Sequence, residues 1–564
     1  MGYVILKFRD EIIDKTGEAL DVSKDLIDEN IEIPSEERGD YALPCYSLSG
    51  VLEKDPKEIA QEVAENVELE KGTLERIGPY VNFKTDRARL SKETILTCLE
   101  MEEDFGTLPS KSKKLIVEHT SANPNGPLHV GRARNPIIGD TLARIYEKAG
   151  YEVETQYYVN DIGRQIAILV WGTLNIDEED LPEVEREKPD HELVRYYQRA
   201  NQLLEEDDDI EEEIQQIIRR MERGEEDIFK HFQKTAKKIM EGIDRSLQRL
   251  GIHLGSYKTE SSLIEDSSVK KVIKQLSDLE DTGKEDGALY YEKEDNRTFL
   301  ARKNGTSLYP ARDIAYHVWK AERADLLVNI LGEDHKLHGE FIQNALKDLN
   351  IQPVPQILFH SFVTFEGQEM STRKGTYVTL DHIMDTAHEK AKEEVKKRRE
   401  VPSDEIKTVA EKIAMGAVRY NIIKVQPQKP IDFVWEEALD FEGDSAPFLQ
   451  YSYTRANSIL EKWSRGSLDI NALDLQQFEK GETKLLKKIS EFPREIEDAV
   501  KNNAPHRLAK YAHGLAGEFN QFYRDYPVLQ AEDKKLERIA IVKSFRSAMG
   551  SVLQTLGIKK PKKM

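Results

Sequence analysis

Residues 117–132, VEHTSANPNGPLHVGR, constrain the fold of this chain more than any other segment. Their pattern is typical of a strand, a loop rich in Pro, Asn and Gly, and the start of a helix that runs to Gly150. Unpaired N–H groups and the helix dipole favour a phosphate group at such a helix start. His129 can donate a hydrogen bond to a phosphate oxygen, and Gly131 lets a flat base approach the backbone closely. The segment therefore predicts a nucleotide site.

A second strand is expected directly after that helix, at residues 151–159. Strand, helix and strand within about 45 residues indicate a parallel βαβ unit, and hence an α/β fold with a doubly wound parallel sheet. The apolar runs 326–331 and 356–360 are expected to extend this sheet. Pro136 fits the helix if the regular turns begin only around Arg134, because proline removes an interior hydrogen bond.

The chain of 564 residues is long enough for about three or four domains. Residues 1–107 mix helical and strand patterns, which predicts an α+β N-terminal domain. Residues 108–444 hold the nucleotide-binding fold, with an acidic helical insertion at about 173–254 whose run at 205–213 is expected to be a solvated surface. From Pro402 the pattern is almost wholly helical, and residues 445–564 are expected to form a helix bundle.

Composition excludes several classes of protein. No apolar run approaches the roughly 20 residues that a membrane span needs, and the first residues lack a signal-peptide pattern, so a cytoplasmic protein is expected. Two cysteines, Cys45 and Cys98, are too few for a disulfide framework or, alone, for a structural zinc site, and we expect half-buried thiols.

The net charge of −22 argues at first against a nucleic-acid partner. Residues 445–564, however, contain 21 Lys and Arg against 14 Asp and Glu, a local charge of +7. Salt screens distant charges within about 8–10 Å, so a basic module on an acidic body can still bind a polyanion. Charge thus indicates where RNA would bind, without showing that it does.

A second phosphate-binding segment is expected at residues 368–375, QEMSTRKG. Its hydroxyl, adjacent cations and glycine could wrap a triphosphate and neutralise charge during phosphoryl chemistry. An ordinary surface turn is the alternative. The sequence does not decide whether Arg373 or Lys374 would contact the phosphates.

Residues 127–132, PLHVGR, resemble the HIGH motif of class I aminoacyl-tRNA synthetases. Residues 157–165, YYVNDIGRQ, make the segment similar to arginyl-tRNA synthetases, and 368–375 resembles the second signature, KMSKS, with Glu369 at its first lysine. The resemblance runs from about residue 75 to the C-terminus. It implies an enzyme that uses ATP, with Mg²⁺, to activate arginine and transfer it to tRNA(Arg).

The resemblance also implies roles for individual residues. Catalysis is implied for His129, Gly131, Arg132, Ser371, Arg373 and Lys374, and ATP binding for Pro127, His129, Gly131, Met370 and Lys374. Arginine binding is implied for Glu118, Asn123, Glu260, Tyr309, Asp313 and His335, with Asp334 as the alternative to His335.

Spacing supports the arginine pocket. Tyr309 and Asp313 are four residues apart, one helical turn, so they share a face. A guanidinium is planar with five donors, and a carboxylate is its natural bidentate acceptor. The alternative for Asp313 is a plain salt bridge to neighbours such as Arg312 or Lys320.

Binding of tRNA is implied at two places. The resemblance suggests an N-terminal domain that grips the tRNA elbow and a C-terminal bundle that binds the anticodon; the residues concerned are Tyr80, Asn82, Phe83, Gln450, Tyr451 and Arg455. Aromatic stacking on unpaired bases suits such a role. An ordinary core strand at 80–83 is the alternative, and most aromatic residues of the bundle are expected in its core.

Other functions remain open. His335 and His338 lie beside acidic residues, but no third and fourth ligand follow at fixed spacing, so no zinc site is expected. Magnesium would come with ATP and needs few protein ligands. A nucleotidylyl transferase that adenylates a small cationic acid without RNA is one rival, and a non-catalytic RNA-binding relative is another. A monomer is expected.

Overall fold

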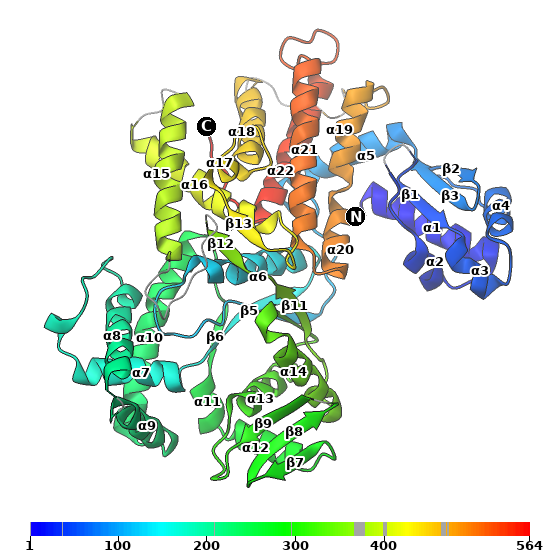
Figure 1. Ribbon diagram of the computed structural model, residues 1–564. Coiled ribbons are helices and arrows are strands. Elements are labelled where there is room, and N and C mark those ends of the chain that lie inside the picture. The colour runs from blue at the N-terminus through cyan, green and yellow to red at the C-terminus, as the bar shows by residue number, and fades with distance from the viewer. Residues whose placement is uncertain are drawn as a thin grey trace.

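A five-stranded parallel sheet lies at the centre of the computed structural model, which describes residues 2–35, 38–207, 209–294, 296–365, 378–398, 403–463, 468, 470 and 473–564 (Figure 1). Its strands are β4 (Lys114–Glu118), β5 (Glu152–Val159), β6 (Ser256–Thr259), β10 (Leu326–Gly332) and β11 (Gln356–His360). The spatial order is β11-β10-β4-β5-β6, and every neighbouring pair is parallel. The doubly wound α/β fold is confirmed.

The strand order reverses between β4 and β10. The chain leaves β4 through α6 (Val130–Lys148) toward β5, and leaves β10 through α14 (Lys336–Asp348) toward β11. A crevice therefore opens at the carboxyl ends of these two strands, where such sheets bind ligands. The expectation that regular helical turns begin only near Arg134 is wrong: α6 begins at Val130 and carries Pro136 inside it.

The acidic insertion between β5 and β6 is helical, as expected. It contains α7 (Arg164–Asn175), α8 (Pro189–Glu206), α9 (Asp209–Glu222) and α10 (Glu226–Arg249), with a short 3₁₀ turn at Glu178–Asp180. Glu205, Glu206 and Asp207 are exposed, whereas Ile214, Ile217 and Phe232 are buried in the core that the insertion shares with the central sheet. The acidic run is a solvated face of an amphipathic layer.

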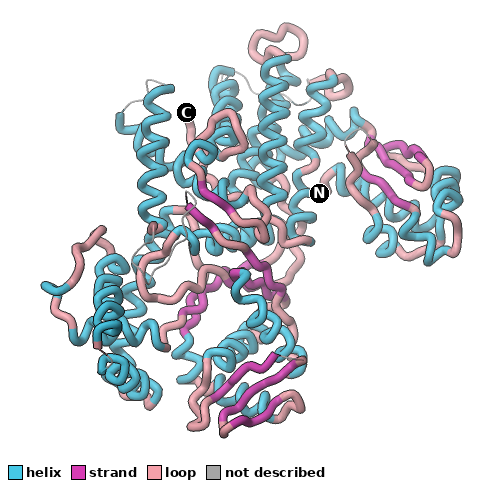
Figure 2. The backbone as a smooth tube through the Cα atoms, in the orientation of Figure 1, coloured by secondary structure: helices cyan, strands magenta, loops and turns pink. Residues whose placement is uncertain are grey.

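A small antiparallel sheet lies between β6 and β10, and the hydrophobic pattern did not predict it (Figure 2). Its strands are β7 (Thr282–Glu285), β8 (Ala288–Lys293) and β9 (Asn296–Ala301), and its neighbours are α11 (Glu260–Glu265), α12 (Ser268–Ser277) and α13 (Tyr309–Ala321). These elements and α14 share a separate core that includes Leu263, Leu300 and Phe341. The unit carries α13 to the edge of the crevice.

The N-terminal domain has the expected α+β character. Its helices are α1 (Val4–Leu20), α2 (Lys24–Asn30), α3 (Tyr46–Leu52) and α4 (Pro56–Asn66), and its antiparallel sheet has the order β1 (Tyr41–Pro44), β3 (Tyr80–Thr85), β2 (Gly72–Ile77). The expected exposure of strand 80–83 is wrong at two positions, since Asn82 is 2% exposed and Phe83 is fully buried in the core. Cys45 and Cys98 are also fully buried, not half-buried.

The C-terminal part is a helix bundle, as expected. Its helices are α15 (Leu380–Arg398), α16 (Ser403–Ile423), α17 (Trp435–Ala438), α18 (Ala446–Trp463), α19 (Lys480–Ser490), α20 (Phe492–Lys501), α21 (Pro505–Asp525) and α22 (Lys535–Thr555). One short strand, β13 (Ile431–Phe433), interrupts the helical pattern and pairs with β12 (Val363–Phe365). Helix α5 (Arg87–Met101), followed by a 3₁₀ turn at Glu102–Asp104, packs against α19 and α22 and joins the N-terminal domain to the bundle. Within the described residues, no helix is long and apolar enough to cross a membrane.

A fully buried guanidinium joins three parts of the molecule. Arg419 of α16 donates to Asp140 Oδ2 of α6 at 2.5 Å, to Leu250 O after the insertion at 3.3 Å, and to Leu556 O after α22 at 3.1 Å. Without the guanidinium the two carbonyls would each lose a buried hydrogen bond, and Asp140 would keep, among the described residues, only its ion pair with Arg144.

We therefore expect Arg419→Met to destabilise the protein by about 3–5 kcal/mol, because it leaves Asp140 buried with less charge compensation. Urea denaturation followed by circular dichroism measures the change. The control is Arg245→Met, at an exposed position of α10. Equal stability of the two variants would contradict the structural role of Arg419.

Candidate active site

The crevice at the carboxyl ends of β4 and β10 is a cavity of about 890 Å³. Eight residues that the sequence singled out line it: Glu118, Asn123, His129, Gly131, Arg132, Tyr309, Asp313 and His335. Pro127 and Glu260 are both buried, and neither lines the cavity. Met370, Ser371, Arg373 and Lys374 lie outside the described residues.

His129 is held at the start of α6 and lines the cavity. It is the N-cap residue and has extended backbone geometry. Its neighbours pair with the segment that precedes α15: Val130 N–H donates to Val378 O at 3.0 Å, and Leu380 N–H donates to Leu128 O at 2.7 Å. Nδ1 of His129 is buried without a hydrogen-bond partner among the described residues. Burial, and secondarily the charge of Arg132, lower the pKa of His129 to about 4.

The acidic end of the cavity is built around Asp313. Its Oδ2 lies 2.6 Å from Nε2 of His338, whose ring stacks on Tyr309 with a centroid distance of 4.5 Å. Burial alone would raise the pKa of Asp313, but His317 and His338 hold it well below its ordinary value. The carboxylate therefore stays charged in a buried place.

The hydrogen bonds of His317 define its tautomer. Its Nε2 faces two donors, Lys320 Nζ at 3.2 Å and Asn329 Nδ2 at 2.7 Å. The amide orientation of Asn329 is fixed because its Oδ1 accepts from Lys320 at 2.9 Å. Nε2 of His317 therefore accepts, and the proton lies on Nδ1, 3.1 Å from Asp313 Oδ1. Nδ1 also lies 2.8 Å from the backbone oxygen of Asp313, so His317 contacts both the main chain and the carboxylate of this residue.

Two other buried carboxylates already have cations of the chain. Lys320 Nζ lies 2.6 Å from Glu118 Oε2, and Arg312 Nε lies 2.6 Å from Glu260 Oε1. The alternative interpretation of Asp313, a salt bridge to Arg312 or Lys320, is therefore wrong. Burial raises the pKa of Glu260 to about 7 against the opposing effect of Arg312. Among the described residues, Asp313 is bonded only through histidines.

Sequence reasoning missed several residues here. Tyr158 lines the cavity, and its hydroxyl is buried without a hydrogen-bond partner among the described residues; its pKa is raised by burial first and then by Glu260 and Asp313. His317 and Lys320 were also missed, although they continue the helical spacing of Tyr309 and Asp313. That spacing was a usable signal. His338 was noticed only as a possible metal ligand, and His335 is exposed beside Asp334.

Comparison with known proteins agrees with this geometry. A family model described as tRNA synthetases class I (R), catalytic domain, matches residues 94–435; a DALR anticodon binding domain matches 449–564, and an arginyl tRNA synthetase N terminal domain matches 7–85. The arginine–tRNA ligase of Methanothermobacter thermautotrophicus is 40% identical over 541 residues, which are 94% of each chain. The chain belongs to the arginyl-tRNA synthetase family.

Family membership holds over the whole chain. The arginine–tRNA ligase of Methanothrix thermoacetophila is 41% identical over 536 residues, with 92% of each chain covered. The structure of the Thermus thermophilus arginyl-tRNA synthetase superposes with a TM-score of 0.84 at 27% identity, covering 98% of this chain and 99% of that one. The class I synthetase assignment and the three-part architecture that the sequence predicted are thus confirmed.

The candidate RNA-contacting residues of this synthetase separate into exposed and buried ones. Gln450 is fully buried, where its amide donates to Lys412 O and Lys559 O, so it holds the bundle together. Arg455 lies between the rings of Tyr451 and Tyr523, at 4.7 and 4.9 Å from their centroids. On the N-terminal domain, partly exposed Tyr80 packs edge-on against Tyr46.

A pH titration tests the environment of His129. We expect its imidazole to stay neutral down to about pH 5, because a buried imidazolium is unfavourable. Arg132→Gln should raise the pKa of His129 while leaving it below the ordinary value of 6.5, since burial is the larger cause. NMR titration of ¹³C-labelled histidine measures both, with Arg245→Gln as the control. Titration of wild-type His129 near 6.5 would contradict the site geometry.

Proposed function

We propose that this synthetase is an arginine–tRNA ligase that activates arginine with ATP and transfers it to the 3′ end of tRNA(Arg). The observation that carries the proposal is Asp313, a charged and buried carboxylate whose partners among the described residues are histidines. Because Glu118 and Glu260 already have internal cations and Asp334 is exposed, Asp313 is the buried carboxylate of the described lining that is left to bind a cationic side chain. A carboxylate has further lone pairs for the planar donor fork of a guanidinium.

The amino-acid side chain would lie between Tyr309, Asp313 and Tyr158. The unpartnered hydroxyl of Tyr158 supplies a further polar contact at this acidic end. Asn123, which donates to Gln165 at 2.8 Å, and Glu118 would face the α-amino and carboxylate groups. His335 or Asp334 would close the pocket from the end of β10.

ATP would bind with its α-phosphate at the start of α6. The arginine carboxylate attacks that phosphorus, pyrophosphate leaves, and a ribose hydroxyl of the tRNA then takes the arginyl group from the adenylate. His129, neutral at physiological pH, would donate a hydrogen bond to the phosphate as charge builds on it. Mg²⁺ would arrive with ATP as part of the substrate. Ser371 and either Arg373 or Lys374 are proposed to add charge stabilisation.

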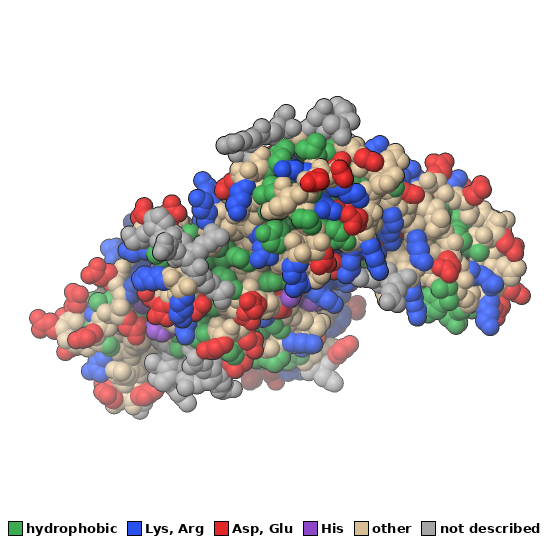
Figure 3. All heavy atoms as spheres, turned by 90° about the horizontal axis from the view of Figure 1, so that it is seen from above, with side chains coloured by type: hydrophobic (Ala, Val, Ile, Leu, Met, Phe, Trp, Pro, Cys, Tyr) green, Lys and Arg blue, Asp and Glu red, His purple; other side chains and the backbone are tan. Residues whose placement is uncertain are grey.

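The tRNA would be held at two separated surfaces. We assign elbow binding to residues 1–107, with Tyr80 as the stacking residue, and anticodon binding to 445–564, with Tyr451 and Arg455. Lys and Arg side chains are interspersed with hydrophobic ones over the bundle in the view from above (Figure 3). The catalytic segment is 108–444. The protein is expected to act as a monomer in the cytoplasm.

Charging of total tRNA with each radiolabelled amino acid in turn tests the function. We expect incorporation of arginine alone. Adenylation of a cationic acid without transfer to RNA would favour a nucleotidylyl transferase instead. No incorporation of any amino acid would favour a non-catalytic RNA-binding relative.

Asp313→Asn should weaken arginine binding far more than ATP binding. The change keeps the size of the side chain but removes the charge that faces the substrate cation, at a cost on the order of 2–4 kcal/mol. Michaelis constants for arginine and ATP measure the difference. The exposed Glu322→Gln, directly after the same helix, is the control. If the Michaelis constant for arginine is unchanged in Asp313→Asn, this carboxylate does not bind the substrate.

His129→Ala should lower the rate of adenylate formation by about 10²–10³-fold, because it removes one donor to the reacting phosphate. Arginine affinity should hardly change. ATP–pyrophosphate exchange with arginine and tRNA present measures the rate, and His382→Ala, at an exposed position of α15, is the control. Near-normal turnover of His129→Ala would reduce His129 to a structural role at the helix start.

A further inference from the structure

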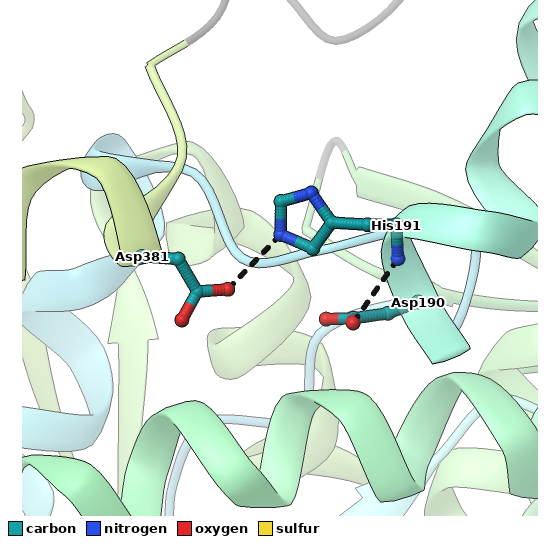
Figure 4. A group of neighbouring side chains, drawn as sticks. All are labelled: Asp190, His191 and Asp381. Atoms are coloured by element: carbon teal, nitrogen blue, oxygen red, sulfur yellow. Dashed lines mark hydrogen bonds and ion pairs between the residues drawn. The ribbon is translucent and has the colours of Figure 1, made fainter. Parts of the chain in front are cut away.

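A buried polar cluster lies outside the cavity, where the helical insertion meets the start of α15 (Figure 4). Asp190 and His191 come from the first turn of α8, and Asp381 is the second residue of α15. His191 Nε2 lies 3.0 Å from Asp381 Oδ2, and the His191 backbone N–H donates to Asp190 Oδ1 at 3.1 Å. All three residues are at most 4% exposed, so their arrangement is fixed by packing.

The cluster has the side chains of a metal site, but a lysine of the chain supplies the positive charge. Nζ of Lys188 lies 3.0 Å from Asp190 Oδ2 and 2.5 Å from Asp381 Oδ2. Ser246 of α10 donates to the other oxygen of Asp381 at 3.0 Å. Burial would raise the pKa of Asp381, but the hydrogen bond from His191 and the charge of Lys188 hold it well below its ordinary value. Lys188 thus supplies one positive charge to the two carboxylates of Asp190 and Asp381.

The position of Asp381 in the chain connects this cluster to His129. Thr379, two residues before Asp381, forms a β-bridge with His129, and the hydrogen bonds of Val130 and Leu380 flank that bridge. The three residues 378–380 therefore lie directly between the cluster and the segment that places the His129 ring. A displacement of Asp381 must be transmitted to this short pairing.

Helix α8 also contacts the other side of His129. Val194, one turn after His191, packs so closely on Gly126 that a Cβ atom at position 126 would lie 2.6 Å from Val194 Cγ2. Gly126 is three residues before His129 in the loop that precedes α6. The buried face of α8 thus touches the loop that leads to His129 and, through Asp381, the segment 378–380 that pairs with residues 128–130.

We propose that Lys188, His191 and Asp381 are positioning residues for the adenylation step. They hold residues 378–380 in register with 128–130, and thereby fix the His129 ring against the cavity. The inference rests on the proposed function, since it assigns these residues to the phosphate chemistry. A misplacement of about 1 Å in such a group can cost on the order of 10²-fold in rate.

A matched control lies one turn further along α15. Asp385 forms ion pairs with Arg186, just before α8, and, at 2.5 Å, with Arg249 of α10, so like Asp381 it joins α15 to the helical insertion. Its side chain is 46% exposed, and it lies farther from residues 378–380. If Asp381 merely attached the insertion to α15, substitution of Asp381 or of Asp385 would affect turnover equally. If Asp381 positions His129, only its substitution would lower turnover strongly.

The experiment compares Asp381→Asn with Asp385→Asn in the full-length protein. We expect Asp381→Asn to lower the turnover of arginine-dependent ATP–pyrophosphate exchange, with tRNA present, by about 10–100-fold, with Michaelis constants for ATP and arginine changed by less than about 3-fold. Asp385→Asn should keep near-normal turnover. In NMR titration, the pKa of His129 should rise from about 4 in Asp381→Asn and remain unchanged in Asp385→Asn.

Further variants keep the test decisive if Asp381→Asn folds poorly. Gly242→Ala places a Cβ atom 2.2 Å from Asp190 Oδ1 and disturbs the cluster from α10, so it should lower turnover as well. His191→Gln keeps a donor toward Asp381 and should retain turnover better than His191→Leu. If all cluster variants keep the turnover of the wild type and an unchanged His129 titration, the inference is overturned. An inactive wild type would instead overturn the proposed function.

Discussion

The parallel pairing of β4 with β10 is the constraint on which the rest of the site depends. Leu326–Asn329 pair in register with Leu115–Glu118, and the chain leaves the two strands toward opposite ends of the sheet. The connections that follow the two strands therefore diverge and open a cavity at their carboxyl ends, which the N-cap residue of α6 lines. His129 from one connection and the segment after Gly332 from the other reach the same cavity because of this reversal.

The amino-acid specificity of this cavity depends on which of its buried carboxylates are already paired with a lysine or arginine of the chain. Lys320 and Arg312 neutralise Glu118 and Glu260, whereas the carboxylate of Asp313 contacts His317 and His338 and, among the described residues, no lysine or arginine. A buried carboxylate in that state is costly until a cation arrives, so an uncharged analogue of the same size would leave it unpaired. Discrimination between arginine and neutral amino acids would then come from the cost of leaving Asp313 without a cation.

The sequence predicted what depends on local pattern and failed where burial depends on distant elements. The strand, loop and helix at 114–148 and the helical spacing of Tyr309 and Asp313 are local, and the structure contains both. Phe83 was assigned to RNA binding but lies in the core, because strand alternation shows two faces without showing which one the helices cover. His338 reaches Asp313 from another helix, and Gln450 is buried by the tail at Lys559, so neither arrangement could be inferred from neighbours in the chain.

An insertion between the halves of a nucleotide-binding sheet has to be attached without disturbing the catalytic crevice. Here the attachment is made by a charged cluster in which Lys188 lies within 3.0 Å of both buried carboxylates, Asp190 and Asp381, so these ion pairs define its geometry. Apolar packing alone tolerates small shifts, whereas hydrogen bonds among buried charges lose most of their energy when displaced. Placing such a cluster next to residues 378–380 makes the insertion part of the support of His129, which explains why polar groups occupy an interface that hydrophobic side chains could also have filled.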